Sequence, residues 1–196
     1  MVSLAEQRPA ARLGAALFRR RSWLPVPFVL VALLVPAHIG AANWIAGAIS
    51  IAIGEAIRLA GVAAAGTVTR RRSRDVQRLV TYGIFAAVRN PLYVGNFLIW
   101  MGFVLISGVR WFIPVAIVLF FVEYTLIVAY EEGVLESIFG EEYLRYKSTT
   151  PRWVPAPRSA PGEHHWGEAW RSEISTFMQY AALVIAFLVK QRYWNG

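Results

Sequence analysis

The sequence predicts an all-α fold, a multi-spanning transmembrane protein with about five membrane helices. Hydrophobic residues make up 57% of the 196-residue chain and charged residues only 16%, whereas a water-soluble domain carries about 25% charged residues. The charged residues are bunched between long neutral stretches, and most arginines flank those stretches. This distribution is typical of helical proteins that cross the bilayer several times.

The composition also argues against several classes of site and partner. The chain has no cysteine, which excludes disulfides, thiolate catalysis and cysteine-ligated metals. Its only histidines, His38, His164 and His165, do not suit a conventional histidine-rich metal centre, so we expect no metal. A net charge of +8 suggests nucleic acid in a soluble protein, but here the arginines border apolar segments. Anionic lipid headgroups are therefore the expected partner, and nucleic acid is not.

Residues 1–22 form the first predicted unit, an N-terminal amphipathic segment. Leu13, Leu17 and Phe18 fall on one helical face, as in a short helix that lies in the membrane interface. A disordered tail explains the same composition equally well. The apolar run after Arg19 continues too far for a cleavable signal peptide and has no clear small-residue cleavage site, so no such signal is expected.

Residues 23–66 form the second predicted unit, a pair of membrane helices. The apolar segment 23–39 is close to the lower limit of about 17 residues for a span. The segment 44–66 is rich in alanine, glycine and isoleucine, and small residues let helices pack closely in lipid. It carries Glu55 and Arg58 on one face. We interpret the two as a neutralising pair, with Arg58 also a candidate substrate contact because charges inside membrane helices are often functional.

Residues 67–158 form the third predicted unit, which carries the candidate site. A strongly basic connector, 67–88, is expected to be solvated or to face lipid headgroups. The apolar segments 92–107 and 111–129 follow, and the short turn between them predicts a tight helical hairpin. Residues 131–158 are polar and amphipathic, and we expect them to form a cytoplasmic segment.

Residues 159–196 form the last predicted unit, a C-terminal extension. Its apolar run, 174–189, has marginal length and either crosses the membrane or lies in the interface; we count it as the fifth span. Arginines crowd the N-terminal tail, the 67–89 connector and residues 141–158. The positive-inside rule therefore predicts a cytoplasmic N-terminus and a cytoplasmic site. We expect the membrane to be a bacterial inner membrane.

The run from Arg89 to Gly95 is the first candidate site motif. It reads Arg-Asn-Pro-Leu-Tyr-Val-Gly, and Pro91 is suited to begin a helix because its missing N–H would have no helical partner there. Free N–H groups and a partial positive charge at a helix start favour an anionic ligand group, and Arg89 adds a planar donor fork. The alternative is a plain interfacial anchor, with the arginine reaching the headgroups and Tyr93 in the aromatic belt.

Two acidic residues, Glu131 and Glu132, follow the fourth apolar segment. Adjacent carboxylates are costly against lipid, so we expect them to face a polar cavity, where they would suit an ammonium or sulfonium. The alternative is a solvated helix end. Tyr143 and Tyr146 come next at helical spacing and would wall a pocket, or simply belong to an amphipathic helix on the membrane. Arg152, held between prolines, would bind an anionic group, unless it is a lone surface arginine.

Taken together, the segment 83–155 resembles the family of isoprenylcysteine carboxyl methyltransferases and phospholipid N-methyltransferases. That family is known for Gly-Pro-Tyr, then Arg-His-Pro-x-Tyr-x-Gly, then Glu-Glu-x-x-Leu-x-x-x-Phe-Gly-x-x-Tyr-x-x-Tyr, then Pro-Arg-x-x-Pro. The last two patterns match without a gap. In the first two, Ile84-Phe85 stands for Pro-Tyr and Asn90 stands for histidine.

The resemblance implies an integral membrane enzyme that transfers a methyl group from S-adenosylmethionine to a lipid or lipidated acceptor. The residues that it marks for cofactor binding are Arg89, Asn90, Tyr93, Gly95, Glu131 and Glu132. The expected catalytic residues are Arg152, Glu132 and Asn90, and the expected substrate contacts are Arg58, Tyr143, Tyr146 and Arg152.

Asn90 bears on the choice of acceptor, because asparagine cannot titrate. A carboxylate acceptor needs no base, whereas an amine acceptor must lose a proton, so the sequence slightly favours a carboxylate. Because Asn90 replaces the histidine of the family, reduced or absent activity is a further alternative. Two other interpretations remain: an NADPH-dependent enzyme similar to the sterol reductases, and a non-catalytic lipid-binding protein. A transporter is disfavoured, because the sequence has no repeated half.

Overall fold

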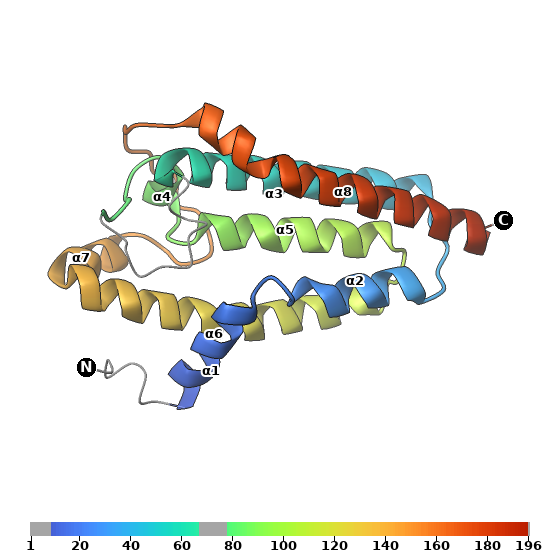
Figure 1. Ribbon diagram of the computed structural model, residues 1–196, viewed down its shortest axis with the longest axis horizontal. Helices are drawn as coiled ribbons and strands as arrows, with labels where there is room; N and C mark the ends of the chain where they lie inside the picture. Colours follow the sequence, from blue (N-terminus) through green and yellow to red (C-terminus); the bar gives the residue numbers. More distant parts are fainter. Residues whose placement is uncertain (1–8, 67–77, 196) are drawn as a thin grey trace.

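A computed structural model describes residues 9–66 and 78–195, and these residues fold into helices joined by short loops (Figure 1). The helices of this part of the chain are α1 (Pro9–Arg20), α2 (Pro25–Leu34), α3 (Ala41–Ala65), α4 (Ile84–Ala87), α5 (Pro91–Ile106), α6 (Phe112–Phe139), α7 (Glu141–Thr149) and α8 (Trp166–Asn195). The predicted basic connector lies largely outside the described residues, as do residues 1–8.

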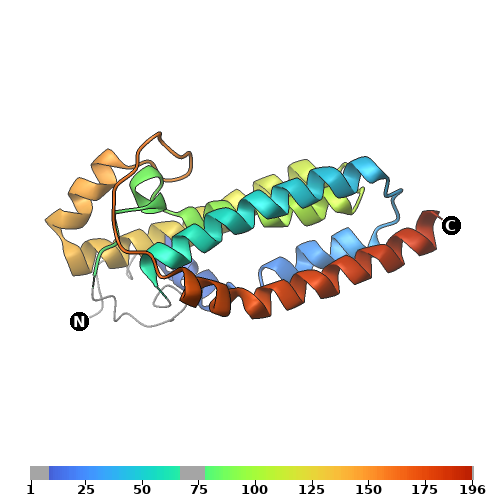
Figure 2. The same ribbon diagram turned by 90° about the horizontal axis from the view of Figure 1, so that it is seen from above.

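Five apolar helices run alongside one another and form the bundle (Figures 1 and 2). α3, α6 and α8, with 25, 28 and 30 residues, are long and apolar enough to cross a membrane, and α2 and α5 are shorter apolar helices. All five predicted apolar segments are therefore helical. α7, α4 and the segment 150–165 gather at the end of the bundle where α3 and α6 end and α5 and α8 begin. We call this the α7 end.

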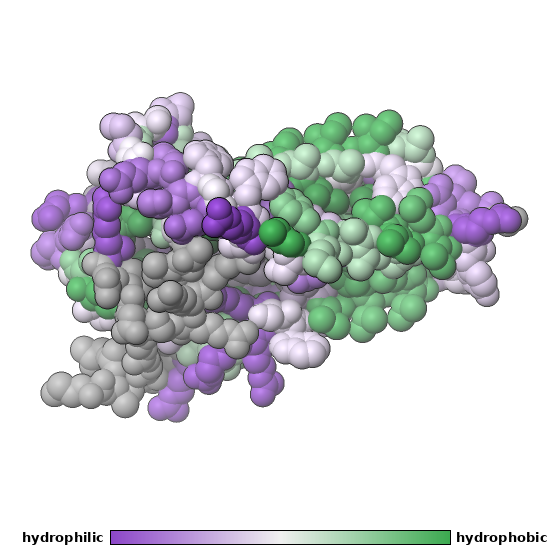
Figure 3. Space-filling model, turned by 45° about the horizontal axis from the view of Figure 1, so that its top comes forward, coloured by the Kyte–Doolittle hydropathy of each residue, from purple (hydrophilic) through white to green (hydrophobic). Residues whose placement is uncertain are grey.

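The outer surface of the bundle has the distribution of apolar, polar and aromatic side chains that is expected of a protein in a bilayer. Figure 3 shows apolar side chains over the helices and polar side chains at the α7 end. Exposed aromatic rings lie near both ends of α8, with Trp166 and Trp170 at one end and Tyr193 and Trp194 at the other. Trp170 and Tyr193 are about 35 Å apart at a helical rise of about 1.5 Å per residue, which fits a hydrocarbon core about 30 Å thick. Such aromatic belts are typical of membrane helices.

The seam between α3 and α5 is the most extensive helix contact in the described chain. Glycines of both helices face each other across it. A Cβ atom added at Gly54 would lie 2.7 Å from the backbone oxygen of Gly95, and one at Gly102 would lie 2.8 Å from the oxygen of Gly47. The small residues noted in the sequence of α3 therefore do let the two backbones approach closely.

The helix ends differ from the predicted segment ends for local physical reasons. The first apolar segment was expected to reach residue 39, but α2 stops at Leu34. Val35 is extended, with φ −74° and ψ 124°, because it precedes Pro36 and a residue before proline is disfavoured in the helical region. The fourth segment loses its apolar character at Ala129, yet α6 continues to Phe139. The apolar stretch indicates which part of the helix can lie in the membrane, and the helix itself continues beyond that stretch.

The two terminal helices also bear on alternatives that the sequence left open. α1 is a helix over the described residues of the N-terminal segment and packs against α6, so the disordered tail is wrong for residues 9–20. α8 begins at Trp166, well before the apolar run at 174–189, and extends beyond its end. Its length permits a full span, with Lys190 and Arg192 at the end away from α7.

Candidate functional site

Glu132 of α6 is a buried carboxylate at the centre of a group of charges at the α7 end. The whole residue is only 3% exposed. Its Oε1 accepts hydrogen bonds from Arg89 Nε at 3.2 Å and from Arg89 Nη2 at 3.1 Å. Arg152 Nε also donates to Oε1 at 3.1 Å, and Arg152 Nη2 donates to Oε2 at 2.5 Å. Both carboxylate oxygens are therefore occupied by arginine donors.

Lys147 of α7 completes this group, which we call the ionic cluster: Arg89, Glu132, Lys147 and Arg152. Its Nζ lies 3.8 Å from Glu132 Oε2 and is paired with Glu136 of the same α6 helix. Arg89 Nη1 donates to the backbone oxygens of Lys147, at 2.8 Å, and of Thr150. A buried carboxylate is stable only when it is well paired, so these contacts are what allow Glu132 to lie inside.

Backbone hydrogen bonds hold the two motif segments beside each other. The N–H of Arg89 donates to the oxygen of Pro151 at 2.9 Å, and the N–H of Ala156 donates to the oxygen of Ala87 at 2.9 Å. The N–H of Gly83 donates to the oxygen of Ala160 at 2.9 Å. The segment 151–160 therefore runs along the segment 83–89, which brings Arg152 back to the start of α5.

Pro91 is the first residue of α5, as the sequence predicted. The preceding residue, Asn90, has its backbone oxygen at the start of the helix, where it accepts hydrogen bonds from Tyr93 N and Val94 N, both at 3.1 Å. The side chain of Asn90 turns away from the helix and donates from Nδ2 to the oxygen of Arg152 at 3.4 Å. Asn90 thus connects the helix start to the arginine of the closing motif.

Tyr143 and Tyr146 of α7 lie next to the ionic cluster and are both buried. Their ring centroids are 6.0 Å apart, and Tyr146 Oη donates to the backbone oxygen of Phe85 at 2.7 Å. Burial raises the pKa of both phenols above the usual value, and the charge of Glu132 raises each pKa further. Both hydroxyls therefore stay protonated at neutral pH and can donate hydrogen bonds.

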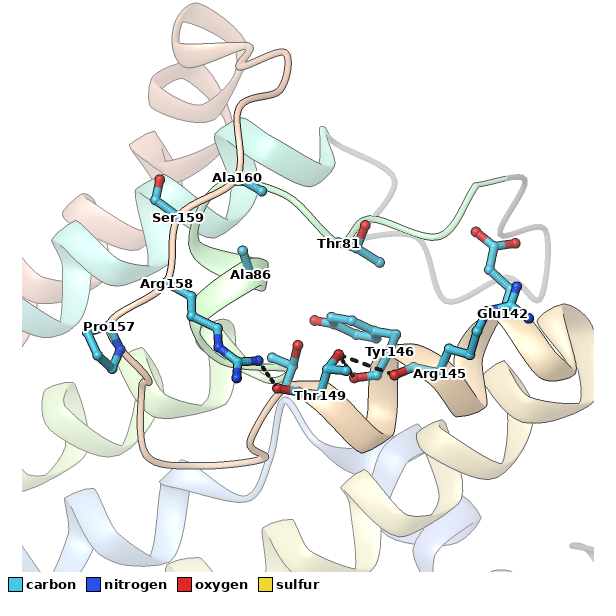
Figure 4. Close-up of a pocket in the computed structure, with 11 residues that line it drawn as sticks. Thr81, Ala86, Glu142, Arg145, Tyr146, Thr149, Pro157, Arg158, Ser159 and Ala160 are labelled. Carbon is cyan, nitrogen blue, oxygen red and sulfur yellow. Dashed lines mark hydrogen bonds between the residues drawn. The ribbon is translucent and has the colours of Figure 1, made fainter.

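An open cleft of about 700 Å³ lies beside the ionic cluster, between α7, α4 and the segment 157–160. Figure 4 shows the ring of Tyr146 and the side chain of Arg158 in this cleft, with Glu142 and Arg145 on the α7 side. Arg158 donates to the backbone oxygen of Thr149. The cleft and the cluster share a wall, because Thr150 lines the cleft while its oxygen accepts from Arg89.

The two adjacent glutamates, expected to act together, have separate surroundings. Glu131 lies 3.7 Å from Arg21, in the connection between α1 and α2, and its side chain is 29% exposed. Adjacent residues of a helix point about 100° apart, so Glu132 faces the cluster while Glu131 faces α1. Tyr93 accompanies Glu131 on that side, where its ring packs at 4.9 Å against Tyr124 of α6.

Arg58 and Gly95 also lie apart from the ionic cluster. Arg58 of α3 is buried between helices, where its Nη2 donates to Glu173 of α8 at 2.9 Å. Gly95 is packed in the α3–α5 seam, where an added Cβ would lie 2.6 Å from Arg58 Cγ. Of the predicted site residues, the structure gathers Arg89, Asn90, Glu132, Tyr143, Tyr146 and Arg152, and it places Arg58, Tyr93, Gly95 and Glu131 elsewhere.

Sequence reasoning missed Lys147, Arg145 and Arg158. Lys147 directly follows the last tyrosine of the Glu-Glu motif, and that position was the available signal. For the two arginines, the only signal in the sequence was the basic character of residues 141–158 as a whole. Within residues 9–66 and 78–195, no group of three histidine, cysteine, aspartate or glutamate side chains is placed to hold a metal ion.

Comparisons with known proteins complete the description of the site. The family described as phospholipid methyltransferase matches residues 42–142. The protein-S-isoprenylcysteine O-methyltransferase of Homo sapiens is 34% identical over an alignment of 124 residues that covers 58% of this chain and 42% of that protein. The protein-S-isoprenylcysteine O-methyltransferase B of Arabidopsis thaliana is 34% identical over an alignment of 122 residues that covers 57% of this chain and 60% of that protein.

These matches cover only part of each protein compared. No solved structure matches the chain, and the chain spans about 42 to 60% of the length of the curated relatives it matches. The family match nevertheless covers just over half of the chain and includes Arg89 and Glu132. The resemblance predicted from the motifs is confirmed: the chain belongs to the phospholipid methyltransferase family and is an integral membrane protein with helical spans.

Proposed function

We propose that this chain transfers a methyl group from S-adenosylmethionine to a lipid or lipidated acceptor, with the α7 end in the cytoplasm of a bacterial cell. The observation that carries the proposal is the meeting of three motif segments on Glu132: Arg89 before α5, Lys147 of α7 and Arg152 after it. Members of the family use S-adenosylmethionine as methyl donor.

The residues at the α7 end fit the chemistry of this cofactor. S-adenosylmethionine carries a carboxylate, an ammonium, a sulfonium, a ribose diol and an adenine ring. The cleft offers Arg145 and Arg158 for a carboxylate, Glu142 for a cation, and the hydroxyls of Thr81 and Ser159 for a diol. The cofactor supplies an electrophilic methyl group when it is bound. The residues of the chain have to hold it and align the acceptor, because alignment is the main requirement of such a transfer.

Glu132 acts in this proposal as the residue that positions the two arginines. Both of its oxygens accept hydrogen bonds, so its negative charge is already matched inside the protein. Arg152 is the more accessible partner, with a side chain 31% exposed against 9% for Arg89. We therefore assign the contact with an anionic group of the ligand or acceptor to Arg152, and the fixed structural end of the cluster to Arg89.

The surface beside Arg152 suits a lipid acceptor. The next residue, Trp153, packs its ring at 5.7 Å against Phe121 of α6. Phe121 belongs to an apolar patch on the outer face of α6, which Val118 and Val122 share. An acyl or prenyl chain lying along that patch would place its polar end toward Arg152. Asn90 cannot accept a proton from an amine, which favours an acceptor that arrives as a carboxylate.

The decisive experiment is transfer of labelled methyl from S-adenosylmethionine into a total lipid extract by the purified protein in vesicles. We expect a labelled lipid whose methyl group is released as methanol by mild alkali, as a methyl ester requires. An alkali-stable product would contradict the carboxylate acceptor but not the transfer. Calorimetry with S-adenosylmethionine and with NADPH tests the reductase alternative. Binding heat with NADPH but not with S-adenosylmethionine would support a reductase.

A variant ties the activity to the site. Arg152→Gln should lower the transfer rate, because it removes the accessible cation of the ionic cluster. Arg192→Gln is the matched control, since this arginine is exposed near the opposite end of α8. Equal rates for both variants and the parent protein would remove Arg152 from the proposal. Absence of any labelled lipid with the parent protein would leave the non-catalytic alternative.

A further inference from the structure

We propose that α8 positions the start of α5 through a relay from Glu173 to Arg58, and that Arg58 is a positioning residue for the site. The inference rests on the proposed function for its effect on rate, but not for its effect on structure. α8 lies beyond residues 42–142, the part matched by the family. The relay would therefore join a helix outside the matched region to the motif that begins α5.

The first link of the relay joins α8 to α3. Arg58 Nη2 donates to Glu173 Oε1 at 2.9 Å and to Oε2 at 3.2 Å. The side chain of Glu173 is fully buried and that of Arg58 is 15% exposed. Glu55 Oε2 lies 3.6 Å from Arg58 Nε and accepts a hydrogen bond from Tyr180 of α8 at 2.8 Å. Two residues of α8 thus bind the charged pair that the sequence of α3 revealed.

The second link joins Arg58 to α5. Arg58 Nη1 donates to Asn96 Oδ1 at 2.5 Å, and the stem of Arg58 fills the space next to Gly95, where a Cβ atom would lie 2.6 Å from Cγ. Gly95 and Asn96 lie in the second turn of α5, just after the run that contains Asn90 and Pro91. Because the backbone of a helix is stiff over so short a distance, a contact at Asn96 sets the place of the helix start.

The relay depends on charge and shape together. The planar fork of arginine lets one side chain bind Glu173 and Asn96 at once, and lysine does not offer that geometry. Breaking a buried ion pair leaves the remaining charge uncompensated, which is strongly unfavourable. In Glu173→Gln, Arg58 would therefore lose its principal partner and move toward Glu55, away from Asn96.

The other end of α8 offers a matched control. There Gln191 accepts a hydrogen bond from Trp44 Nε1 at 2.9 Å and donates to the oxygen of Ile39 at 3.1 Å. These contacts hold α8 against the same α3 helix and the loop before it, but at the end far from Arg58. Gln191→Ala loosens α8 without touching the relay, so it reports what loss of helix packing alone does.

The test measures amide hydrogen exchange over residues 92–96 in the full-length protein in vesicles, for the parent chain, Glu173→Gln and Gln191→Ala. We expect faster exchange at 92–96 in Glu173→Gln only. We also expect kcat to fall about tenfold in Glu173→Gln with similar thermal midpoints for the two variants, which is less than the ~10²-fold that a 1 Å misplacement can cost. Arg58→Lys, a milder change, serves if Glu173→Gln does not fold.

Each outcome decides the proposal. Unchanged exchange at 92–96 in Glu173→Gln, or in Arg58→Lys, overturns the relay whatever the activity. Equal changes in Glu173→Gln and Gln191→Ala also overturn it, because α8 would then act only by packing. Faster exchange confined to the relay variants supports it even if the parent protein transfers no methyl group, in which case the proposed function fails and the positioning role stands.

Discussion

Arg89 and Arg152 donate hydrogen bonds to the same atom, Oε1 of Glu132, from opposite ends of the motif region. Arg89 precedes α5, and Arg152 follows α7. A shared oxygen forces the two guanidinium groups close together, which only a buried carboxylate makes favourable. The relationship turns three separate motifs into one site and gives the most direct tests of it.

Replacing Glu132 should be far more damaging than replacing its neighbour Glu131. Glu132→Ala leaves two arginines facing each other inside the protein, so we expect a loss of about 3–5 kcal/mol in the free energy of unfolding and loss of activity. Glu131→Ala removes a 3.7 Å pair that is part exposed, for which about 1 kcal/mol or less is expected. Denaturation of both variants in the same detergent provides the comparison, and equal losses would argue against the buried cluster.

The arginines of the cleft should contribute to binding of the cofactor. Arg158→Gln removes a cation from the cleft wall, and a hydrogen bond to a charged group is worth about 1.5–3 kcal/mol. The Kd for S-adenosylmethionine should therefore rise about tenfold or more. Calorimetric titration measures it, with Arg171→Gln as control because Arg171 is exposed on α8. An unchanged Kd for Arg158→Gln would move the cofactor away from this cleft.

The α3–α5 seam predicts which glycines cannot be changed. Gly54→Ala would bring a methyl group to 2.7 Å from the oxygen of Gly95, and overpacking of this kind costs about 1–3 kcal/mol. Gly167→Ala is the control, because a Cβ there would meet no atom of the described residues within 4 Å, and alanine is the better helix former. Thermal unfolding should show a lower midpoint for Gly54→Ala only; a tolerant Gly54 would contradict the close approach.

Alkaline pH should destabilise the α7 region through Tyr146. Burial raises the pKa of its phenol, so the folded state favours the protonated form. The stabilisation is complete below the unfolded-state pKa of about 10 and is lost as pH rises from there toward the higher folded-state pKa. Tyr146→Phe should weaken this loss of stability above about pH 10. Thermal midpoints measured across that range test it, and an unchanged pH dependence in Tyr146→Phe would contradict it.

The sequence predicted the parts of this fold that depend on apolar length and local chain chemistry. Pro91 begins α5 as expected, and the turn after Ser107 joins α5 to α6 in the predicted hairpin. Arg89 also meets Glu132, and the family resemblance had marked both residues for one cofactor site. These features can be predicted from short-range sequence rules and one family resemblance.

Other placements depended on packing that the sequence does not display. The resemblance marks Gly95 as a cofactor contact, whereas the structure shows a second reason for glycine there: α3 approaches so closely that the helix seam requires it. The sequence makes Arg58 a candidate substrate contact. In the structure it pairs with Glu173, which lies on α8 just before the predicted apolar run 174–189. Neither contact follows from periodicity, because each depends on which helices become neighbours.

The tight glycine seam has a consequence for how any ligand enters. Sliding of α3 along α5 would bring larger side chains into this contact, so it is disfavoured. Movement that would admit the proposed cofactor or acceptor is easier on the other side of the site, where α7 and the segment after it are joined to Arg89 and to α6 by hydrogen bonds and ion pairs. Opening would consist of exchanging those polar links for links to the incoming molecule, while the apolar seam stays shut.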